Sequence, residues 1–523
     1  MEQQPILLYR TDHVRDMDRY AIDVLGVDGY LLMTRAAQAS LDLLRSAFAG
    51  ARTVLVVCGA GNNAGDGYVL ARLAMDTGMR VRVLAVSAPE MLKGDALRAW
   101  QDFVDRGGQV DTFDEAMASR CDVIVDALLG TGLNREVSGA HLRAIHWMNQ
   151  GLSPVLSLDV PSGLNSDTGL AQPVAVRASF TPTFIALKIG LYTGRASTYC
   201  GDIKIYDLDI PSSVATRFEP VARILVQEDV RTCLPPRRHD AHKGVHGRVL
   251  IVGGNAGMSG AVVLAAAAAL RSGAGTVTVA CHPDNRQIVA ASMPEIMCVG
   301  VECAQVLEVL LDGCDVVAVG PGLGRDDWAQ ALLDVVLSRN LPLVIDADGL
   351  RLVAKAGRLP EAGVRIVTPH PGEAAALGGK TNAEVQESRL ETARWIAHRY
   401  NAVVALKGAG TVVVKPVENP LVDTAAERSE HEHVTGVLPA EETAVCNLGN
   451  PGMATAGTGD VLTGIVAGIW AQQSRRDDCA FEVTCAAVYV HAEAGDKAAI
   501  DGERGLIASD LLAQVRQCVN INP

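Results

Sequence analysis

Three stretches in the N-terminal half place polar side chains directly after apolar runs. GAGNNAGDG at 59–67 follows TVLVVC, VDALLGTGL contains Asp126, and LSLDVPSGLNSDTG contains Asp159 and Ser162. The glycines of the first stretch have the spacing G-x-G-x-x-x-G, which differs from the G-x-G-x-x-G pattern of dinucleotide-binding loops. Its Asn and Asp side chains predict a loop that binds a cation or a hydroxylated ligand rather than a bare pyrophosphate.

The residue types in these stretches indicate two kinds of chemistry. Asn63, Asp126 and Ser162 carry hard oxygen donors, which predict a site for a monovalent cation or magnesium. Asn63 and Ser162 could equally contact a ligand directly. Asp159 ends an apolar run and is expected to be part-buried, which suits proton transfer. No nucleophile stands beside a base, so acid–base catalysis is favoured over covalent catalysis. For any single loop, an ordinary helix cap or turn is the alternative interpretation.

The C-terminal half contains a glycine-rich stretch, NPGMATAGTGDVLTGIVAGI, at 450–469. Gly457, Thr458 and Gly459 precede a helix that we expect to begin near Asp460. Backbone N–H groups and the helix dipole can together form an anion hole for a phosphoryl group. Asp460 can accept the proton of an attacking hydroxyl group at the same place.

Other strand-end loops accompany this stretch. LKGAGT at 406–411 predicts a second phosphate-compatible loop, and VTPHPGE places His370 at a strand end, where it could orient a substrate or act as a base. HDAHKGVH at 239–246 contains three histidines, but its glycines and the lack of a fourth ligand disfavour zinc.

The elements that position these residues are alternating apolar runs and helical patterns. In the N-terminal half, we expect strands at 53–58, 80–87, 121–128, 154–160 and 202–210, and helices at 66–78, 92–106 and 139–150. The same alternation restarts after a stretch rich in proline and charge at about 211–245. The pattern predicts an α/β protein with two tandem domains, 1–220 and 221–523, each with a parallel sheet covered on both faces. The acidic segment 418–442 predicts a surface excursion between two strands.

The composition narrows the class of protein. The chain has 523 residues, a formal net charge of −14 and 49% hydrophobic residues, which argue for a globular protein and against a nucleic-acid partner. The 12 cysteines include no C-x-x-C pair, and no signal peptide or membrane-length apolar run is evident. We expect a cytoplasmic protein that forms a homo-oligomer, binds small molecules and has no membrane partner.

The N-terminal half resembles the NAD(P)H-hydrate epimerase family. The motifs GAGNNAGDGYVLARL, VDALLGTGL, LSLDVPSGLNSDTG and TPTFIALKIGL occur in the family's order, and the resemblance covers about residues 10–215. It implies a Rossmann-like, doubly wound sheet that interconverts the R and S epimers of hydrated NADH and NADPH. It implies potassium ligands Asn63, Asp126 and Ser162, and a catalytic carboxylate, Asp159. The implied substrate contacts are Asn62, Asn63, Ala64, Gly65, Asp66, Gly130, Thr131, Gly132, Leu133, Asn134, Arg135, Glu136 and Asp159.

The C-terminal half resembles the ADP-dependent NAD(P)H-hydrate dehydratase family, which is ribokinase-like. The motifs are HKGVHGRVLIVGGNAGMSGA, VGPGLG, VIDADGL, TPHPGE, LKGAGT and NPGMATAGTGDVLTG. The resemblance implies dehydration of the S hydrate at the expense of ADP with magnesium, and Asp460 as a catalytic residue. The implied substrate contacts are Ala261, Gly322, His370 and Asp460, and the implied nucleotide contacts are Lys407, Gly408, Ala409, Gly410, Thr411 and Gly459.

Together, the two resemblances predict a bifunctional enzyme that repairs hydrated NADH and NADPH. The alternative is a ribokinase-like small-molecule kinase fused to a nucleotide-binding domain, since the glycine-rich loops of the C-terminal half fit both. A regulatory protein without turnover is disfavoured, because Asp159 and Asp460 are both present.

Overall fold

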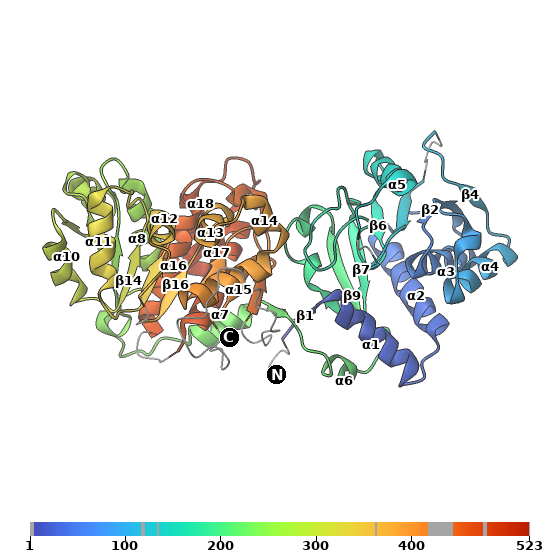
Figure 1. Cartoon of the computed structure of the whole chain (residues 1–523), viewed down its shortest axis with the longest axis horizontal. Helices are drawn as coiled ribbons and strands as arrows, with labels where there is room; N and C mark the ends of the chain where they lie inside the picture. Colours follow the sequence, from blue (N-terminus) through green and yellow to red (C-terminus); the bar gives the residue numbers. More distant parts are fainter. Residues whose placement is uncertain are drawn as a thin grey trace. The chain divides into compact units, whose positions relative to one another are not determined.

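The computed structural model describes residues 5–116, 121–132, 135–360, 363–416, 443–473 and 478–521. Within this part of the chain, Leu7–Ala222 form one compact unit, here called the N-terminal unit, and the remaining described residues form the C-terminal unit (Figure 1). We propose that these units are the two domains, divided after residue 222 rather than 220. Ile6 belongs to the C-terminal unit, where its carbonyl accepts a hydrogen bond from the Ile224 N–H at 2.8 Å. The segment 418–442, predicted as a surface excursion, lies outside the described residues, as do Leu133 and Asn134.

The N-terminal unit alternates strands and helices. Its strands are β1 (Leu7–Tyr9), β2 (Thr53–Cys58), β3 (Arg80–Ala85), β4 (Val110–Thr112), β5 (Val123–Ala127), β6 (Val155–Ser157), β7 (Phe180–Phe184), β8 (Leu187–Lys188) and β9 (Asp202–Tyr206). Its helices are α1 (Thr11–Asp23), α2 (Gly29–Ala47), α3 (Asn62–Asp76), α4 (Gly94–Asp105), α5 (Gly139–Gln150) and α6 (Ser212–Ala215).

The main sheet of this unit is parallel, in the order β4-β3-β2-β5-β6-β7-β9. Alternate residues of β2 point to opposite faces. Val54 and Val56 pack in a cluster with α2, α3 and α4, whereas Val57 packs in a cluster with α5. Both faces are therefore buried, which explains the continuous apolar run of this strand. The predicted doubly wound α/β fold is confirmed. In such a fold, ligands bind along the edge that the carboxyl ends of the strands form.

Several predicted boundaries differ from those of the structure by one or more residues, and two of these differences affect the polar edge. Helix α3 begins at Asn62, four residues before the predicted start at 66, because Gly61 is extended (φ −118°) and starts the helix there. Strand β6 ends at Ser157 rather than 160, since Asp159 adopts a left-handed conformation with φ +65°. Asn62 and Asn63 therefore lie in the first turn of a helix, and Asp159 lies in a sharp turn.

The C-terminal unit follows the same plan with more elements. Its strands are β10 (Ala222–Ile224, beginning at the boundary), β11 (Arg248–Val252), β12 (Thr276–Cys281), β13 (Met297–Gly300), β14 (Val316–Val319), β15 (Leu343–Ile345), β16 (Arg365–Val367), β17 (Val403–Leu406), β18 (Thr411–Val414) and β19 (Thr443–Cys446). Its helices are α7 (Gln227–Cys233), α8 (Ser259–Ser272), α9 (Arg286–Ser292), α10 (Ala304–Leu311), α11 (Asp327–Leu337), α12 (Ala347–Ala356), α13 (Pro371–Gly378), α14 (Asn382–Glu387), α15 (Arg389–Tyr400), α16 (Thr458–Gln473), α17 (Ala480–Ala498) and α18 (Ala508–Cys518).

The sheet of this unit has the order β13-β12-β11-β14-β15-β16-β17-β18-β19-β10. The strands from β13 to β17 are parallel, and β18 runs antiparallel to both of its neighbours. The parallel strands bring the loops after β14, β15, β16 and β17 to one edge. This arrangement gathers VGPGLG, VIDADGL, TPHPGE and LKGAGT in one region, as the predicted α/β fold requires.

Close packing between α8 and α16 fixes the position of the N-terminus of α16, which carries Asp460. A Cβ added at Gly464 of α16 would overlap the carbonyl oxygen of Ala265 in α8, and one at Gly468 would overlap Ser272. The two backbones therefore touch, and the alanine-rich sequence of α8 allows that approach. The packing sets the position of the α16 N-terminus relative to the sheet.

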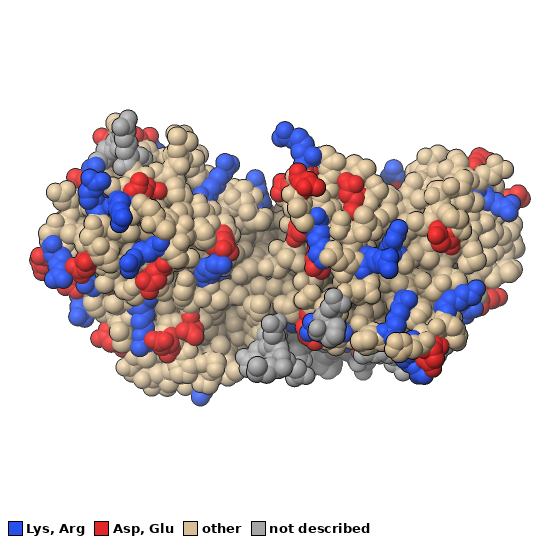
Figure 2. Space-filling view, turned by 180° about the vertical axis from the view of Figure 1, so that it is seen from behind, with Lys and Arg blue, Asp and Glu red and all other residues tan. Residues whose placement is uncertain are grey.

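The helices and the charged side chains of the surface are the features that bear on what a membrane protein requires. Among the helices of the described residues, none is long and apolar enough to cross a bilayer. Figure 2 shows basic and acidic side chains interspersed over the face that it draws. The cytoplasmic location and the homo-oligomer stay predictions from the sequence.

The contact between α8 and α16 gives a first test. We expect Gly464→Ala to lower the stability of the C-terminal unit by about 1–3 kcal/mol, because the added methyl group must push the two helices apart. Gly260→Ala in α8 is the matched control, since a Cβ there has no atom within 4 Å. Calorimetric unfolding of the full chain measures both. Equal transition temperatures for the two variants would contradict this account of the packing.

Candidate active sites

In the N-terminal unit, Asp126 and Ser162 form one hydrogen-bonded group at the end of β5. Asp126 is fully buried, and each of its two carboxylate oxygens accepts two hydrogen bonds. Oδ1 accepts from the Leu128 N–H (3.2 Å) and the Ser162 hydroxyl (2.6 Å), and Oδ2 accepts from the Ser157 hydroxyl (2.8 Å) and the Ser162 N–H (2.9 Å). Burial raises the pKa of Asp126, although these hydrogen bonds lower it in part. The carboxylate therefore ties the loop after β6 to the end of β5.

Asn63 lies close to the loop that follows β5. A Cβ added at Gly130 would lie 3.3 Å from the Asn63 side chain. The Asn63 amide Nδ2 and Oδ1 are both buried and have no hydrogen-bond partner in the protein. Buried polar atoms without a partner are uncommon in native structures. The Asn63 amide is therefore a group that a bound ligand or cation could satisfy.

Asp159 pairs with a buried lysine that the sequence analysis did not select. Lys188, at the end of β8, is 1% exposed, and its ammonium group donates to Asp159 Oδ1 at 2.5 Å. It also donates to the Thr183 hydroxyl and the Phe184 carbonyl, both at 2.9 Å. The ammonium group thus has three acceptors for its three N–H bonds. The signal in the sequence was a lone lysine in an apolar run, TPTFIALKIGL.

Two further carboxylates lie near this pair. Burial, together with the charges of Asp159 and Asp18, raises the pKa of Asp66 well above its ordinary value. Burial and the charge of Asp159 also raise the pKa of Asp18 on α1, and Lys188 partly offsets this rise. Asp159, Asp66 and Asp18 thus lie within electrostatic reach of one another, an arrangement that favours retention of a proton at neutral pH. Asp18 was missed because a lone aspartate in a helix carries no distinguishing pattern.

The other predicted substrate contacts in this unit differ in how exposed they are. Ala64 is fully buried, and Gly65 packs against Met33 of α2, so a ligand can contact these two residues only through their backbone groups. The Thr131 carbonyl accepts a hydrogen bond from the Arg15 guanidinium. Asn62, Gly132, Arg135 and Glu136 are exposed.

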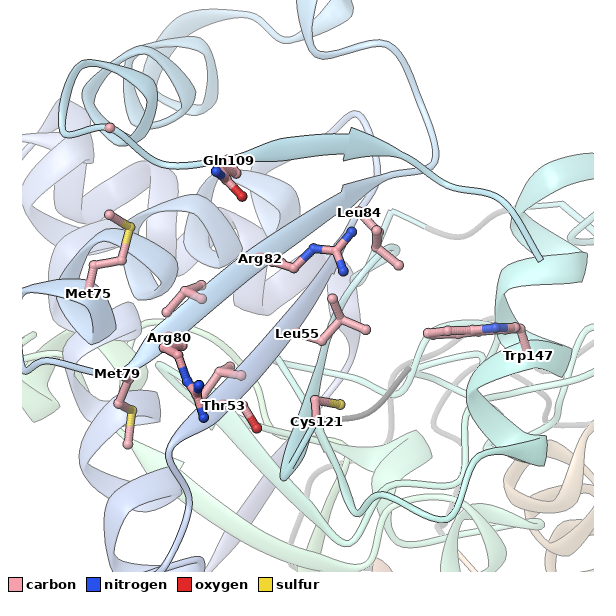
Figure 3. A pocket seen from close by; sticks show the side chains of 13 residues that line it. Thr53, Leu55, Met75, Met79, Arg80, Arg82, Leu84, Gln109, Cys121 and Trp147 are labelled. Carbon is pink, nitrogen blue, oxygen red and sulfur yellow. The ribbon is translucent and has the colours of Figure 1, made fainter. Parts of the chain in front are cut away.

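The N-terminal unit also has a cavity that none of the predicted residues lines. Figure 3 shows it beside β2 and β3, with Arg80, Arg82 and Trp147 among its walls. Its volume is about 660 Å³. It extends along β3 as far as Leu84 and reaches the amino ends of both strands, where Thr53 and Arg80 begin β2 and β3. It therefore reaches the sheet edge opposite Asn63 and Asp126, and neither residue lines it.

In the C-terminal unit, a second buried ion pair connects three sheet-edge loops. Asp346 follows β15 and is 1% exposed. Its Oδ1 accepts from the Lys407 ammonium group at 2.7 Å, and its Oδ2 accepts from the Thr463 hydroxyl of α16 at 2.6 Å. Glu373 Oε2 lies 3.8 Å from the same ammonium group. Burial acts to lower the pKa of Lys407, but the charges of Asp346, Glu373 and Asp460 raise it overall. Lys407 therefore stays charged beside the predicted anion hole.

Asp460 lies in the first turn of α16, next to this pair. A Cβ added at the preceding Gly459 would lie 3.3 Å from Lys407 Nζ and 3.7 Å from Asp346 Oδ2. Burial and the charge of Asp346 raise the pKa of Asp460 to about 7, with a smaller contribution from Glu373, while Lys407 opposes the rise. A carboxyl group with this pKa can accept and release a proton near neutral pH.

His370 caps a helix, which narrows the two roles that the sequence left open. Its Nδ1 accepts hydrogen bonds from the N–H groups of Gly372 (2.9 Å) and Glu373 (3.3 Å) at the start of α13. Burial and the positive charges of Lys407 and Arg351 lower the pKa of His370. The ring is therefore neutral, and its Nδ1 lone pair is occupied. This geometry favours orientation of a ligand over proton abstraction.

The predicted nucleotide loop, 407–411, is held by a buried arginine. Arg389 is 3% exposed, and its Nη2 donates to the carbonyls of Leu406 (3.1 Å), Lys407 (3.3 Å) and Gly410 (3.3 Å). Burial lowers the pKa of Arg389 to about 10. Because three carbonyls turn toward this guanidinium, the loop has a fixed shape. Arg389 was not selected from the sequence, since it lies on α15, outside every loop motif.

The loop after β14 lies against the start of α8. Gly322 has φ +56°, and a Cβ there would lie 2.7 Å from the Met258 carbonyl and 3.2 Å from the Ala261 side chain. The structure thus brings Ala261 and Gly322 together. The Gly324 N–H donates to Asp348 Oδ2 at 3.0 Å, which ties this loop to α12.

These two edges define the class of the protein. Each unit presents polar loops and an aspartate–lysine pair at the carboxyl edge of a parallel sheet, and one unit adds a glycine-rich helix start suited to a phosphoryl group. The chain is an α/β enzyme of two units that acts on nucleotides.

Comparison with known proteins identifies the family. Residues 249–437 and 428–517 match the family model described as NAD(P)H-hydrate dehydratase, and residues 29–190 match that of the YjeF-related protein N-terminus. The chain is 41% identical to the bifunctional NAD(P)H-hydrate repair enzyme Nnr of Coxiella burnetii, over 98% of this chain and 99% of that protein. It is 37% identical to the enzyme of the same name from Escherichia coli, over 99% and 96% of the two chains. The chain belongs to the family of bifunctional NAD(P)H-hydrate repair enzymes, and combines an isomerase with a lyase.

Two of the solved structures similar to this chain each cover a little over half of its length. An ADP/ATP-dependent NAD(P)H-hydrate dehydratase from Bacillus subtilis, co-crystallised with ATP and Mg²⁺, is 26% identical, with a TM-score of 0.46, and is covered over 96% of its own length. A ribokinase-like superfamily protein from Enterococcus faecalis is 28% identical, with a TM-score of 0.48, and is covered over 94%. The two comparisons cover 56% and 57% of this chain.

The buried pair in the N-terminal unit gives a second test. We expect Lys188→Met to destabilise this unit by about 3–5 kcal/mol, because it leaves buried carboxylates without their counter-charge. Lys204→Met is the control, since its pair with Asp202 is 47% and 56% exposed and should contribute less than about 1 kcal/mol. Urea unfolding measures both. The double variant Lys188→Met with Asp159→Asn should regain part of the loss, and a cost for Lys188→Met no larger than the control's would refute the assigned role.

Proposed function

We propose that Asp159 moves the proton in epimerisation and that Lys188 holds this carboxylate in place. The direct contact between the two groups, beside Asp66 and Asp18, supports this assignment. The hydrate would lie against the N-terminal turn of α3 and the loop 130–136. Main-chain groups at Ala64 and Gly65 then provide contacts, since these residues turn no side chain toward a ligand.

The residues present fit a potassium ion in part. Asn63 Oδ1 is a buried oxygen without a partner, which a cation would satisfy. Asp126 already accepts four hydrogen bonds, so it could coordinate directly only if the Ser162 hydroxyl turned away from it. We therefore assign Asn63 and nearby carbonyls as direct ligands, with Asp126 and Ser162 supplying negative charge and oxygen behind them. A potassium ion there would offset repulsion between the substrate's phosphates and the carboxylates.

In the C-terminal unit, Asp460 accepts the proton of the substrate hydroxyl group as that oxygen attacks the terminal phosphoryl group of ADP. AMP is released, and the hydroxyl group becomes a phosphate ester. Phosphate then leaves, and loss of a proton from the neighbouring ring carbon restores the double bond of NADH or NADPH. The observation that carries this assignment is the position of Asp460, with a pKa of about 7, beside Gly459 and the Asp346–Lys407 pair.

The remaining residues of this edge bind and orient. The loop 407–411, shaped by Arg389, and Gly459 offer N–H groups to the nucleotide phosphates, and Lys407 adds a positive charge. Ala261, Gly322 and His370 hold the hydrate. Magnesium bound with ADP would neutralise phosphate charge during the transfer.

Two reciprocal variants test the division of labour. Asp460→Asn should lower dehydration by roughly 10²–10⁴ and leave epimerisation intact, because the carboxylate that accepts the proton is lost. Asp159→Asn should leave repair of the S hydrate unchanged and slow repair of the R hydrate to its spontaneous rate of epimerisation. The return of NADH absorbance from each epimer with ADP and magnesium reports both. Equal losses on the two epimers would mean that the roles are not divided in this way.

The fall of the dehydration rate at acidic pH, here called the acid limb, tests the protonation state of Asp460. The carboxylate must be ionised to accept a proton, so kcat/KM should fall about tenfold per pH unit below pH 7 and level off above it. Asp346→Asn removes a negative charge that raises this pKa, so the limb should move to lower pH. Asp334→Asn, on the exposed part of α11, is the control and should leave the limb in place. If the acid limb did not shift in Asp346→Asn, ionisation of Asp460 would not be its cause.

Crystals soaked in rubidium test the potassium site. We expect an anomalous signal within bonding distance of Asn63 Oδ1, and we expect Asn63→Ala to remove it. Epimerisation should slow when a bulky organic cation replaces potassium. A site that takes only magnesium, in octahedral geometry at about 2.1 Å, would overturn the assignment.

A further inference from the structure

The C-terminal unit contains a cationic cavity that none of the assigned contacts explains. Its volume is about 420 Å³, and its walls are Arg325, Arg351, Leu352, Ala354, Lys355 and Ala376. Three of the six lining residues carry a positive charge, in a chain whose formal net charge is −14. Local positive charge against an acidic background indicates a site for an anion.

The three positively charged side chains belong to two segments of the chain. Arg351 and Lys355 lie four residues apart on α12, so their side chains lie on one face of the helix. Arg325 directly follows the Gly322–Gly324 loop. Its Nε lies 3.9 Å from Asp348 Oδ1, so it is held by an acidic neighbour. Among the described residues, no ion pair involves Arg351 or Lys355, and both are exposed. Because Asp348 balances the charge of Arg325, the positive charges of Arg351 and Lys355 are the two that remain available to a ligand.

The elements that line the cavity are connected to those that carry the residues assigned to the hydrate. Asp348 binds the Gly324 N–H at 3.0 Å, so the first turn of α12 is attached to the loop that carries Gly322. The charge of Arg351 contributes to lowering the pKa of His370, which places the guanidinium within electrostatic reach of that ring. Ala376 lies in α13, the helix that His370 caps. The residues that line the cavity therefore belong to, or directly follow, the segments that carry or contact Gly322 and His370.

We propose that this cavity binds a phosphoryl group of the hydrated nicotinamide nucleotide during dehydration. The inference rests on the proposed assignment of Gly322, His370 and Asp460 as the dehydratase site. A guanidinium and an ammonium group on one helix face match a phosphate in charge, and the arginine adds two parallel N–H donors. The acidic groups nearby are Asp348, Glu373 and Asp346; Asp348 faces Arg325, while Glu373 and Asp346 are paired with Lys407.

The substrate offers two sources of that phosphoryl group, and they can be told apart. The pyrophosphate is present in hydrated NADH and hydrated NADPH, whereas the 2′-phosphate is present only in hydrated NADPH. A site for the pyrophosphate affects both substrates equally. A site for the 2′-phosphate affects only hydrated NADPH, and would make Arg351 and Lys355 determinants of cofactor preference.

The test uses Arg351→Gln and Lys355→Gln in the full chain, with Arg358→Gln as the matched control. Arg358 is also exposed and follows α12, but it does not line the cavity. For each variant, KM and kcat are measured for the S epimers of hydrated NADH and hydrated NADPH, and KM is measured for ADP. We expect KM to rise about tenfold or more for at least hydrated NADPH, as for the loss of a charge-assisted hydrogen bond. The values of kcat and the KM for ADP should stay at those of the unmodified protein.

The outcomes separate this inference from the function on which it rests. An equal rise in KM for both hydrates assigns the pyrophosphate, and a rise for hydrated NADPH alone assigns the 2′-phosphate. Unchanged KM values for both hydrates, or a rise in KM for ADP alone, would overturn the inference. Neither result affects the dehydratase assignment if Asp460→Asn is inactive in the same assay. If the unmodified protein regenerated no NADH from the S hydrate, the proposed function itself would fail.

Discussion

Each unit buries a lysine against an aspartate that follows a central strand. Lys188 pairs with Asp159 in the N-terminal unit, and Lys407 pairs with Asp346 in the C-terminal unit. Removal of two charges from water is costly, so such pairs persist only where several hydrogen bonds hold them. Lys188 meets that condition with three acceptors, and Asp346 meets it with Lys407 and Thr463. The rest of each site is arranged around its pair.

The parallel sheet determines where such a pair can lie. Both faces of each main sheet are covered by helices, so the carboxyl edge is where polar groups can gather without disturbing the core. A positive charge fixed at this edge allows further carboxylates to approach. Asp66 and Asp18 accompany Lys188, and Glu373 and Asp460 accompany Lys407. Burial, together with the neighbouring negative charge, then raises the pKa of these carboxyl groups, and the pKa of Asp460 reaches about 7 in this way.

The two edges differ in how they can treat a phosphate. The C-terminal edge has a helix start, a lysine and a loop whose carbonyls are turned toward Arg389, and it has Arg351 and Lys355 close by. The N-terminal edge has three neighbouring carboxylates, of which Asp159 pairs with Lys188, and its buried Asn63 amide lacks a hydrogen-bond partner. Transfer of a phosphoryl group suits the first arrangement. Movement of a proton, with a cation to balance the charge, suits the second.

Sequence patterns were sufficient for the fold and for the loops. Continuous apolar runs predicted β2 at 53–58 without error, and glycine-rich stretches located the end of the strand that carries Asp126 and the loops that carry His370 and Lys407. They failed where conformation depends on a single residue. Helix α3 begins at Asn62 because Gly61 is extended, and β6 ends early because Asp159 takes a positive φ. Neither conformation leaves a periodic signal, so pattern reasoning put both boundaries in the wrong place.

The sequence by itself determined the class, the two-part order of the chain and the family, because these depend on local patterns and motif order. Only the tertiary structure decided which charges meet. Lys188 lies 29 residues from Asp159, Lys407 lies 61 from Asp346, and Arg389 reaches a loop beyond its own helix. The strength of each contact depends on distance and burial, which separation along the chain does not reveal. For the same reason, His370 could be placed at a strand end from its sequence, but its Nδ1 could be seen to cap α13 only in the folded chain.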